Sequence, residues 1–149
     1  MRFNDVIIFC RILFVLLILG CAAQPQSSYL IDSCRRLEVG HQLFAGREGA
    51  YWGENMLSTS DQVQGRKKKI GAVSEGTKVR VSGIFKDSDG SYGAFLRVEV
   101  TIIDGPYSGV KVDVPACVPY HPSVKWVESC SLNANELRFN EKLTSDCSN

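Results

Sequence analysis

A run of β-forming residues from Thr77 to Val114 constrains the fold of this chain more than any other part of its sequence. Polar and apolar side chains alternate over most of the run, with the period of a half-buried strand. Turn-forming residues interrupt it at Asp87–Gly90 and again at Asp104–Gly109. We therefore predict a three-stranded antiparallel meander at the centre of the fold. The expected strands are Lys78–Phe85, Ala94–Ile103 and Val110–Val114.

Less regular segments precede the meander. The glycines in Gly46–Gly49 favour a turn between two strands of a β-hairpin, Gln42–Ala45 and Ala50–Trp52. A short helix over Asp32–Val39 is an alternative in this region. Polar residues dominate Gly53–Gly71, so we expect an exposed loop there.

The segments after the meander are predicted to close the domain. Three prolines in Pro115–Pro122 exclude a central strand and favour a rigid cover over one end of the fold. Val124–Val127 is a candidate edge strand. Asn133 as N-cap, with Glu136 three residues later, predicts a short helix over Asn133–Lys142.

Short strands at close spacing and little helix favour a mainly-β protein with a small antiparallel barrel. The Gly-Thr-x-Val-x-Val motif at Gly76 and the Asp-Gly-Pro-Tyr-x-Gly-x-x-Val motif at Asp104 resemble SH3-like barrels. In that family a glycine-rich hairpin joins consecutive strands. The resemblance covers this central part of the chain and implies an SH3-like barrel, with an OB-type barrel as the alternative.

An export signal is predicted at the N-terminus. Arg2 and Arg11 flank a short polar beginning, and the apolar run Ile12–Leu19 precedes the small residues Gly20–Ala23. Because Arg11 interrupts the apolar segment, that segment is too short to span a membrane. Small residues after the apolar run are typical of a cleavage region. The pattern therefore indicates a signal peptide.

The end of this signal, Ile18–Cys21, resembles a bacterial lipobox, in which an aliphatic and a small residue precede a cysteine. The resemblance implies cleavage before Cys21 and diacylation of its sulfur, although Leu19 is larger than is usual at its position. Ala22 after the cysteine favours the outer membrane, with the domain facing the periplasm. The alternative is cleavage after Ala22 or Ala23, which would leave a secreted or periplasmic soluble protein. The expected divisions are a signal peptide over 1–20, a lipid-anchored tether over 21–32 and a single domain over 33–149.

Cysteines provide the predicted covalent framework. Four remain when Cys10 in the signal and Cys21 in the lipobox are set aside. Four cysteines in an exported chain imply two disulfides with three possible connectivities. We favour the arrangement that closes the proline-rich loop and ties the two ends of the domain, while the other two connectivities stay open. The favoured pairs are Cys117–Cys130 and Cys34–Cys147.

Catalytic, cofactor and metal sites are not expected from the sequence. The chain has no Gly-x-Ser-x-Gly elbow, and only His41 and His121 could act as a general base. Zinc-type spacing would place cysteines two to four residues apart, which this chain does not do. Asp87–Ser91 resembles the start of a calcium loop, but the closing carboxylate position holds Val98. We therefore interpret this segment as a turn.

The charge of the chain favours no class of partner. The formal charge is +1, and removing Arg2, Asp5 and Arg11 with the signal leaves a neutral domain. A neutral domain has no overall field that attracts nucleic acid, so no nucleic-acid partner is expected. The basic run Arg66–Lys69 could contact phosphates or lipid head groups, but without interleaved aromatics it is more typical of a solvated loop.

Aromatic side chains on loops form the predicted binding face. Rigid rings give contact area at low entropic cost, although each ring could instead cover an open end of the barrel. We expect a noncatalytic envelope lipoprotein that binds the membrane through its anchor and an envelope protein or peptidoglycan through its domain. The alternative is an exported inhibitor or immunity-type protein that inserts Pro115–Pro122 into a partner protein. The candidate binding residues are Tyr92, Tyr107, Tyr120 and Trp126.

Overall fold

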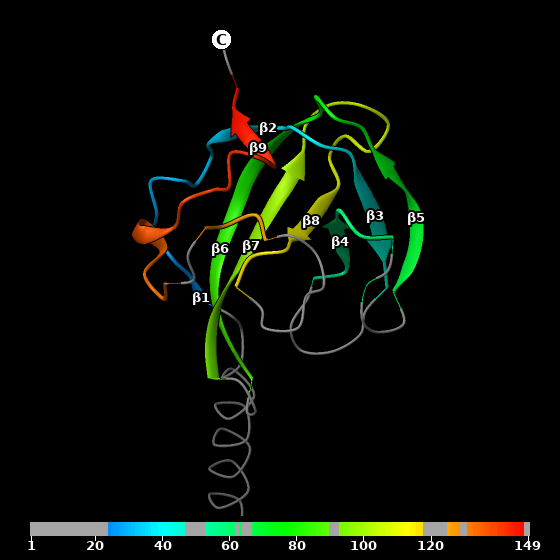
Figure 1. The fold of residues 1–149 in the computed structure, drawn as a ribbon. Coiled ribbons are helices and arrows are strands. Elements are labelled where there is room, and N and C mark those ends of the chain that lie inside the picture. The colour runs from blue at the N-terminus through cyan, green and yellow to red at the C-terminus, as the bar shows by residue number, and fades with distance from the viewer. Residues whose placement is uncertain are drawn as a thin grey trace, which may run out of the picture.

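The computed structural model describes residues 24–46, 53–61, 63, 67–89, 93–117, 125–128 and 131–147. These residues form nine β-strands and one short 3₁₀ helix (Figure 1). Within these ranges, no helix is long and apolar enough to cross a membrane. The elements are β1 (Gln24–Pro25), β2 (Cys34–Leu37), β3 (His41–Ala45), β4 (Asn55–Ser58), β5 (Lys68–Val73), β6 (Lys78–Asp89), β7 (Gly93–Ile102), β8 (Lys111–Val114), η1 (Ala134–Glu136) and β9 (Thr144–Asp146).

All nine strands belong to one sheet. Its strand order is β5-β3-β4-β8-β7-β6-β2-β9, and β1 pairs with β6 farther along the edge that β2 occupies. Neighbouring strands are antiparallel except β4 and β8, which are parallel and share the single register pair Met56↔Asp113. In the described part of the chain the hydrogen-bonded path has two ends, β5 and β9. The mainly-β prediction is therefore confirmed, but the described sheet does not close into the small antiparallel barrel that was predicted.

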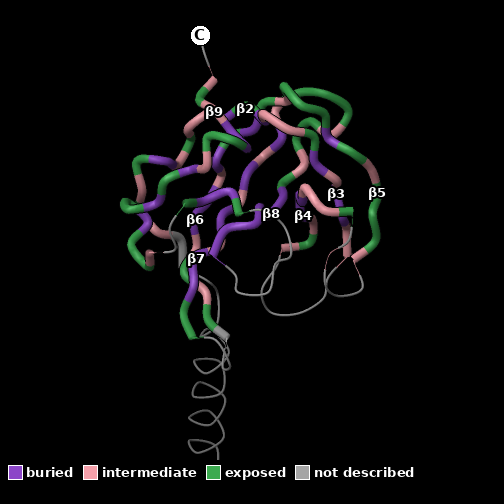
Figure 2. The backbone as a smooth tube through the Cα atoms, in the orientation of Figure 1, coloured by how far each residue is buried: buried purple, intermediate pink, exposed green. Residues whose placement is uncertain are grey.

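The open sheet curls around one apolar core. Buried segments lie inside the curl and exposed segments on its outer side and at its turns (Figure 2). The sheet achieves this without closing because its long central strands bend. A bulge at Ser82 in β6 adds one residue between Val81 and Gly83 and increases the local twist. The core includes Leu37, Leu43, Leu57, Val79, Val81, Ile84, Leu96, Val98, Val100, Ile102, Val112, Val114, Trp126 and Leu137.

The predicted meander is confirmed as β6, β7 and β8. The second strand buries Leu96, Val98, Val100 and Ile102 completely, as the alternation indicated. The first strand is longer than expected, because its pairing with β7 continues to Asp89↔Gly93. The β6–β7 hairpin consequently projects beyond the other strands (Figure 1).

The predicted hairpin before the meander exists with a different second strand. Antiparallel pairing joins β3 to Asn55–Ser58, while residues 50–52 lie outside the described part. The expectation of an exposed loop over Gly53–Gly71 is therefore wrong, since β4 and most of β5 fall within it. Two apolar residues suffice for β4 because Leu57 enters the core and Met56 is buried on the opposite face.

The predicted C-terminal helix is also wrong. Asn133 does act as an N-cap, with Oδ1 accepting a hydrogen bond from the Asn135 N–H at 3.1 Å, but η1 ends at Glu136. Leu137 and Phe139 are both buried, and that two-residue spacing suits extended chain rather than a helix. Phe139 forms a β-bridge with Val127, which is the described remnant of the predicted edge strand.

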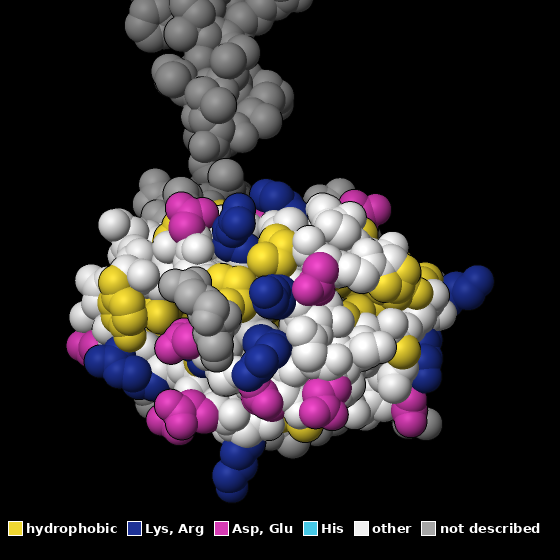
Figure 3. All heavy atoms as spheres, turned by 90° about the horizontal axis from the view of Figure 1, so that it is seen from above, with side chains coloured by type: hydrophobic (Ala, Val, Ile, Leu, Met, Phe, Trp, Pro, Cys, Tyr) yellow, Lys and Arg dark blue, Asp and Glu magenta, His cyan; other side chains and the backbone are white. Residues whose placement is uncertain are grey.

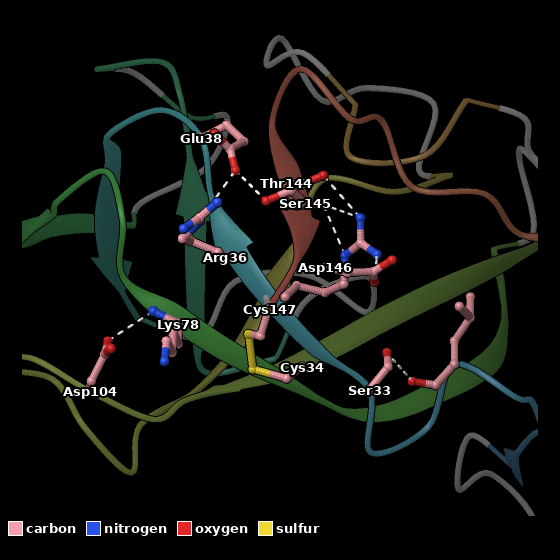
Figure 4. The surroundings of a disulfide bond; sticks show 12 residues. Ser33, Cys34, Arg36, Glu38, Lys78, Asp104, Thr144, Ser145, Asp146 and Cys147 are labelled. Carbon is pink, nitrogen blue, oxygen red and sulfur yellow. Dashed lines mark hydrogen bonds and ion pairs between the residues drawn. A yellow bond between two sulfur atoms is a disulfide. The ribbon is translucent and has the colours of Figure 1, made fainter. Parts of the chain in front are cut away.

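One predicted disulfide is confirmed. Cys34 at the start of β2 is bonded to Cys147 just after β9, and the Cys147 N–H donates to the Cys34 carbonyl at 3.2 Å (Figure 4). Beside it, Glu38 accepts from Ser145 and pairs with Arg36. The second pair remains a prediction, because Cys130 lies outside the described residues. Its expected partner, Cys117, is buried.

The predicted tether lies against the sheet over its described part. Gln24 and Pro25 pair with β6, and the Asp32 N–H donates to the Val81 carbonyl at 2.9 Å. Leu30 between them is buried in the core. Residues 1–23, which include the predicted signal peptide and Cys21, lie outside the described part.

Candidate functional site

The structure describes two of the four predicted binding aromatics, and neither forms an exposed binding face. Trp126 is 0% exposed, so its assignment to that face is corrected to a core position. Tyr107 is half-buried and packs against the core, with its hydroxyl over Gly71, where no room is left for a Cβ. Tyr92 and Tyr120 lie outside the described residues.

The described histidine, His41, holds the buried tryptophan in place. Its Nε2 accepts a hydrogen bond from Trp126 Nε1 at 2.9 Å, and its Nδ1 lies 2.9 Å from the Val39 carbonyl. Desolvation by burial lowers the pKa of His41, and the Val39 carbonyl opposes this change. Both ring nitrogens are therefore occupied in a neutral imidazole, an arrangement that suits structure rather than proton transfer. His121 lies outside the described residues.

A row of residues crosses five strands on the face of the sheet opposite the core. The register places the two apolar members, Phe44 and Met56, next to one another on β3 and β4. Both are buried, yet neither belongs to the main core cluster. Polar residues begin where the row crosses the parallel junction into β8. In strand order the row is Phe44, Met56, Asp113, Glu99 and Gly83.

Asp113 is the buried carboxylate at this junction, with only 1% of its surface exposed. It accepts a hydrogen bond from the Gly53 N–H, and Arg97 Nη1 lies 3.3 and 3.4 Å from its two oxygens. Desolvation raises the pKa of Asp113, while Gly53 and Arg97 oppose the rise and nearby Glu99 adds to it. The Asp113 side chain thus connects β8 to β7 and to the segment just before β4.

Arg97 reaches Asp113 across a platform of small and aromatic residues. Its guanidinium carbon lies 4.9 Å from the centre of the Phe85 ring, which is cation–π distance. The ring in turn lies over Gly83, where a Cβ would collide with it. Arg97 Nε is 4.0 Å from Asp87 Oδ2, close enough for an ion pair and too far for a hydrogen bond.

Lys67 extends the same network to the preceding loop. Its Nζ donates to the Gly46 carbonyl at 2.7 Å and to the Gly53 carbonyl at 3.0 Å. Desolvation lowers the pKa of Lys67, and the charge of Asp113 opposes this. Lys69 pairs with Asp61 at 2.9 Å. Two lysines of the predicted basic run therefore have partners within the chain, while Arg66 lies outside the described residues.

A groove of about 390 Å³ opens between β4 and β8 above Asp113. On its rim Lys111 Nζ lies 3.3 Å from Glu99 Oε1, which also accepts from Ser82 at 2.9 Å. The Asn55 side-chain amide donates to the Lys111 carbonyl at 3.2 Å. No group of three metal-ligating side chains occurs in the ranges given above. The groove is lined by Gly53, Glu54, Asn55, Glu99, Val110, Lys111, Val112 and Asp113.

The sequence carried only a weak signal for this site. In Val110–Val114 the charged residues alternate with valines, so Lys111 and Asp113 both read as outward-facing and solvated. Lys111 is indeed exposed, whereas Asp113 is buried by the approach of Gly53 and Arg97. Gly53 and Arg97 are distant from Asp113 in the sequence, so no local sequence pattern around Asp113 could predict that they bury it.

No protein-family model, no curated protein and no solved structure matches this chain. The groove between β4 and β8 is therefore assigned from its own residues.

Proposed function

We propose that the chain is a noncatalytic binding protein of the bacterial envelope, held at the periplasmic face of the outer membrane by lipid on Cys21. The resemblance of Ile18–Cys21 to a lipobox supports the anchor. The disulfide between Cys34 and Cys147 supports an oxidising compartment, where such bonds persist. An envelope protein or peptidoglycan is the proposed partner of the domain.

The observation that carries a binding role is the groove between β4 and β8. It is open to solvent on a sheet that is braced by one core and a disulfide. Its deepest carboxylate, Asp113, is occupied by Gly53 and Arg97, so its oxygens are already used for structure. A general acid or base must instead reach a substrate proton directly or through one water. The groove thus favours recognition over catalysis.

Two finer features belong to the proposal. We place the second disulfide between Cys117 and Cys130, which would close the proline-rich loop. We propose a resemblance to SH3-like barrels only for the meander β6–β7–β8, because the sheet as a whole is open.

The intact mass of the mature protein purified from membranes tests the anchor. We expect two or three acyl chains on an N-terminal Cys21 and a loss of about four hydrogens for two disulfides. The matched variant Cys21→Ser should lose both the acyl mass and membrane fractionation. A bare chain beginning at Ala23 or Gln24 would overturn the anchor and leave a diffusing exported protein.

Partner capture separates the proposed role from the inhibitor alternative. We expect the anchored protein to cross-link to an envelope protein or to sediment with purified cell wall. A tight one-to-one complex that depends on Pro115–Pro122 would favour an inhibitor instead. The described start of that loop belongs to the domain, because Pro115–Cys117 is buried and the Pro115 carbonyl accepts from the Trp126 N–H at 2.7 Å.

A further inference from the structure

We propose that the groove between β4 and β8 binds an extended peptide segment carrying lysine or arginine. The inference rests on the proposed binding function and names the chemistry of the partner at that site. Three properties of the groove support it: the backbone geometry of its walls, the charge of its rim and its size.

The walls of the groove are two strands that separate after one ladder pair. Met56↔Asp113 is the register pair that joins β4 to β8, whereas β7 and β8 pair over four residues. Beyond that pair the Asn55 side-chain amide, rather than a backbone group, donates to the Lys111 carbonyl. Peptides commonly bind where an extended chain can lie along a strand, since main-chain hydrogen bonds give affinity and side-chain pockets give specificity. The opening between Asn55 and Lys111 leaves room for an extended segment to lie along these strands.

The rim of the groove is acidic. Glu54 and Glu99 lie there beside one cationic side chain, Lys111, and Asp113 lies deeper in the lining. Asp113 is paired with Arg97 below the floor, which leaves Glu54 and Glu99 to face a ligand. Interfaces of complementary charge favour the matching partner and speed its association. A peptide with a positive side chain is the complementary occupant.

Lys111 marks where the positive group of the ligand would lie. Its Nζ is 3.3 Å from Glu99 Oε1, and 65% of its side chain is exposed. The Glu99 side chain is 19% exposed, so Lys111 forms the solvated half of the pair, and a ligand can displace such a hydrated ammonium at low cost. Val110 and Val112 beside it provide apolar surface for the aliphatic stem of a lysine or arginine.

The volume of the groove limits what it can hold. About 390 Å³ lies near the lower end of the range for ligand pockets, roughly 300–1,000 Å³. This space fits one long side chain and the backbone around it rather than a folded surface. The occupant is therefore a short segment of a larger chain.

Opposite changes on one ion pair test the proposal. We would measure fluorescence anisotropy of a labelled, end-blocked peptide of alternating threonine and lysine with the full mature chain. Glu99→Gln should weaken binding about threefold, and Lys111→Met should tighten it about threefold, because the first removes an attracting charge and the second removes a competing cation. The exposed pair Lys69 and Asp61 supplies the control, since Asp61→Asn removes a carboxylate outside the groove lining and should change nothing.

Several outcomes would overturn the inference. Weakening by Lys111→Met, equal effects of Asp61→Asn and Glu99→Gln, or equal binding of a threonine–glutamate peptide would each do so. Competition by spermidine as strong as that by the unlabelled peptide would show simple charge attraction without a peptide site. Changes in amide NMR chemical shifts on titration should concentrate at Glu54, Asn55 and Val112. Changes confined to other residues would show that the peptide does not bind in the groove.

Failure here and failure of the proposed function can be told apart. An acylated protein that cross-links in the envelope but ignores the lysine peptide would overturn only the groove assignment. A soluble, unacylated chain that binds the peptide with the expected order of variants would overturn only the membrane anchor.

Discussion

Two arginines stack on phenylalanine rings in this protein. The carboxylate that pairs with one of them is exposed, and the carboxylate that pairs with the other is buried. Arg35, which is on β2, has its guanidinium carbon 5.0 Å from the centre of the Phe139 ring, and Arg97, which is on β7, has its own 4.9 Å from the centre of the Phe85 ring. Around Arg35 the cation is buried while the side chain of its partner Asp146 is 84% exposed. Around Arg97 the carboxylate is buried and the arginine side chain is 17% exposed. The arginine is therefore the more buried partner in the first pair, and the carboxylate is the more buried partner in the second.

The difference separates an ion pair whose carboxylate is hydrated from one whose carboxylate is buried. At the β2–β9 end Arg35 donates to the Thr144 carbonyl at 2.9 Å, and the Cys34–Cys147 disulfide closes the same pair of strands. At the β4–β8 junction the strands share one register pair, and Asp113 is held only by noncovalent partners. Charged side chains of both signs are interspersed over the face that is seen from above, where no single sign dominates (Figure 3). The two ion pairs therefore differ in the local burial of their carboxylates, and no overall electrostatic field distinguishes the β2–β9 end from the β4–β8 junction.

Removing the disulfide should produce the largest loss of stability. Cys34→Ala with Cys147→Ala should lower the free energy of unfolding by about 4 to 5 kcal/mol, because the bond closes a loop of 113 residues in the unfolded chain. Urea unfolding of the variant and of the unreduced wild type measures this. A loss below about 1 kcal/mol would show that noncovalent contacts alone fix the β2–β9 end.

Breaking each arginine pair tests the comparison directly. Arg97→Met should cost about 3 to 5 kcal/mol, because it leaves Asp113 buried without its cation. Arg35→Met should cost only about 1 to 2 kcal/mol, since the carboxylate that it leaves behind is hydrated. Adding Asp113→Asn to Arg97→Met should recover much of the loss. Equal costs in the two single variants, measured by urea unfolding, would remove the distinction between the ends.

The buried contact between Trp126 and His41 should have a moderate effect. Trp126→Phe removes the indole N–H and leaves His41 Nε2 without its donor, which should cost about 1 to 3 kcal/mol. Thermal unfolding above pH 7 checks the cost. Because burial lowers the pKa of His41, its contribution is present above about pH 6.5 and is lost as the pH falls through the folded pKa. His41→Gln should therefore flatten the loss of stability on the acid side.

The smallest expected effect concerns the ionisation of Asp113. Its folded pKa is raised, so the native state binds the proton more tightly than the unfolded chain does. Stability from this group should fall as the pH rises from about 3.8 through the folded pKa. The stability difference between the wild type and Asp113→Asn, followed by urea unfolding across this range, should shrink or change sign in that direction. A difference that grows with pH would mean that Arg97 and Gly53 outweigh desolvation.

Local patterns predicted the parts of the fold that depend on local chemistry. The meander followed from the alternation in Thr77–Val114, and the glycine turn at Asp104–Gly109 is present, with Gly105 and Gly109 at positive φ. The N-cap at Asn133 also formed, but the helix after it did not, because Leu137 and Phe139 are buried at strand spacing. Propensity indicated where that segment begins, and tertiary packing decided its conformation.

Contacts between residues that are distant in the sequence explain the features that could not be predicted from it. Met56 and Leu57 were too few to predict β4, yet each fills one face of the sheet. Asp113 resembled any polar strand residue until Gly53 and Arg97 covered it. Trp126 was expected on the surface because nothing near it in sequence reveals that His41 would accept its N–H.

The pairing of Gln24 with β6 limits the length of the segment that could link the domain to a lipid anchor. Two residues lie between Cys21 and Gln24, and the three Cα-to-Cα steps that join them span at most about 11 Å when fully extended. The polar layer of a bilayer is itself about 5 to 8 Å thick on each side. A domain attached through Cys21 would therefore lie against the lipid head groups, with little freedom to rotate or to extend away from the membrane. The segment Phe85–Lys86, which pairs with β1, would be held near the membrane, so partners would have to come within reach of the bilayer surface.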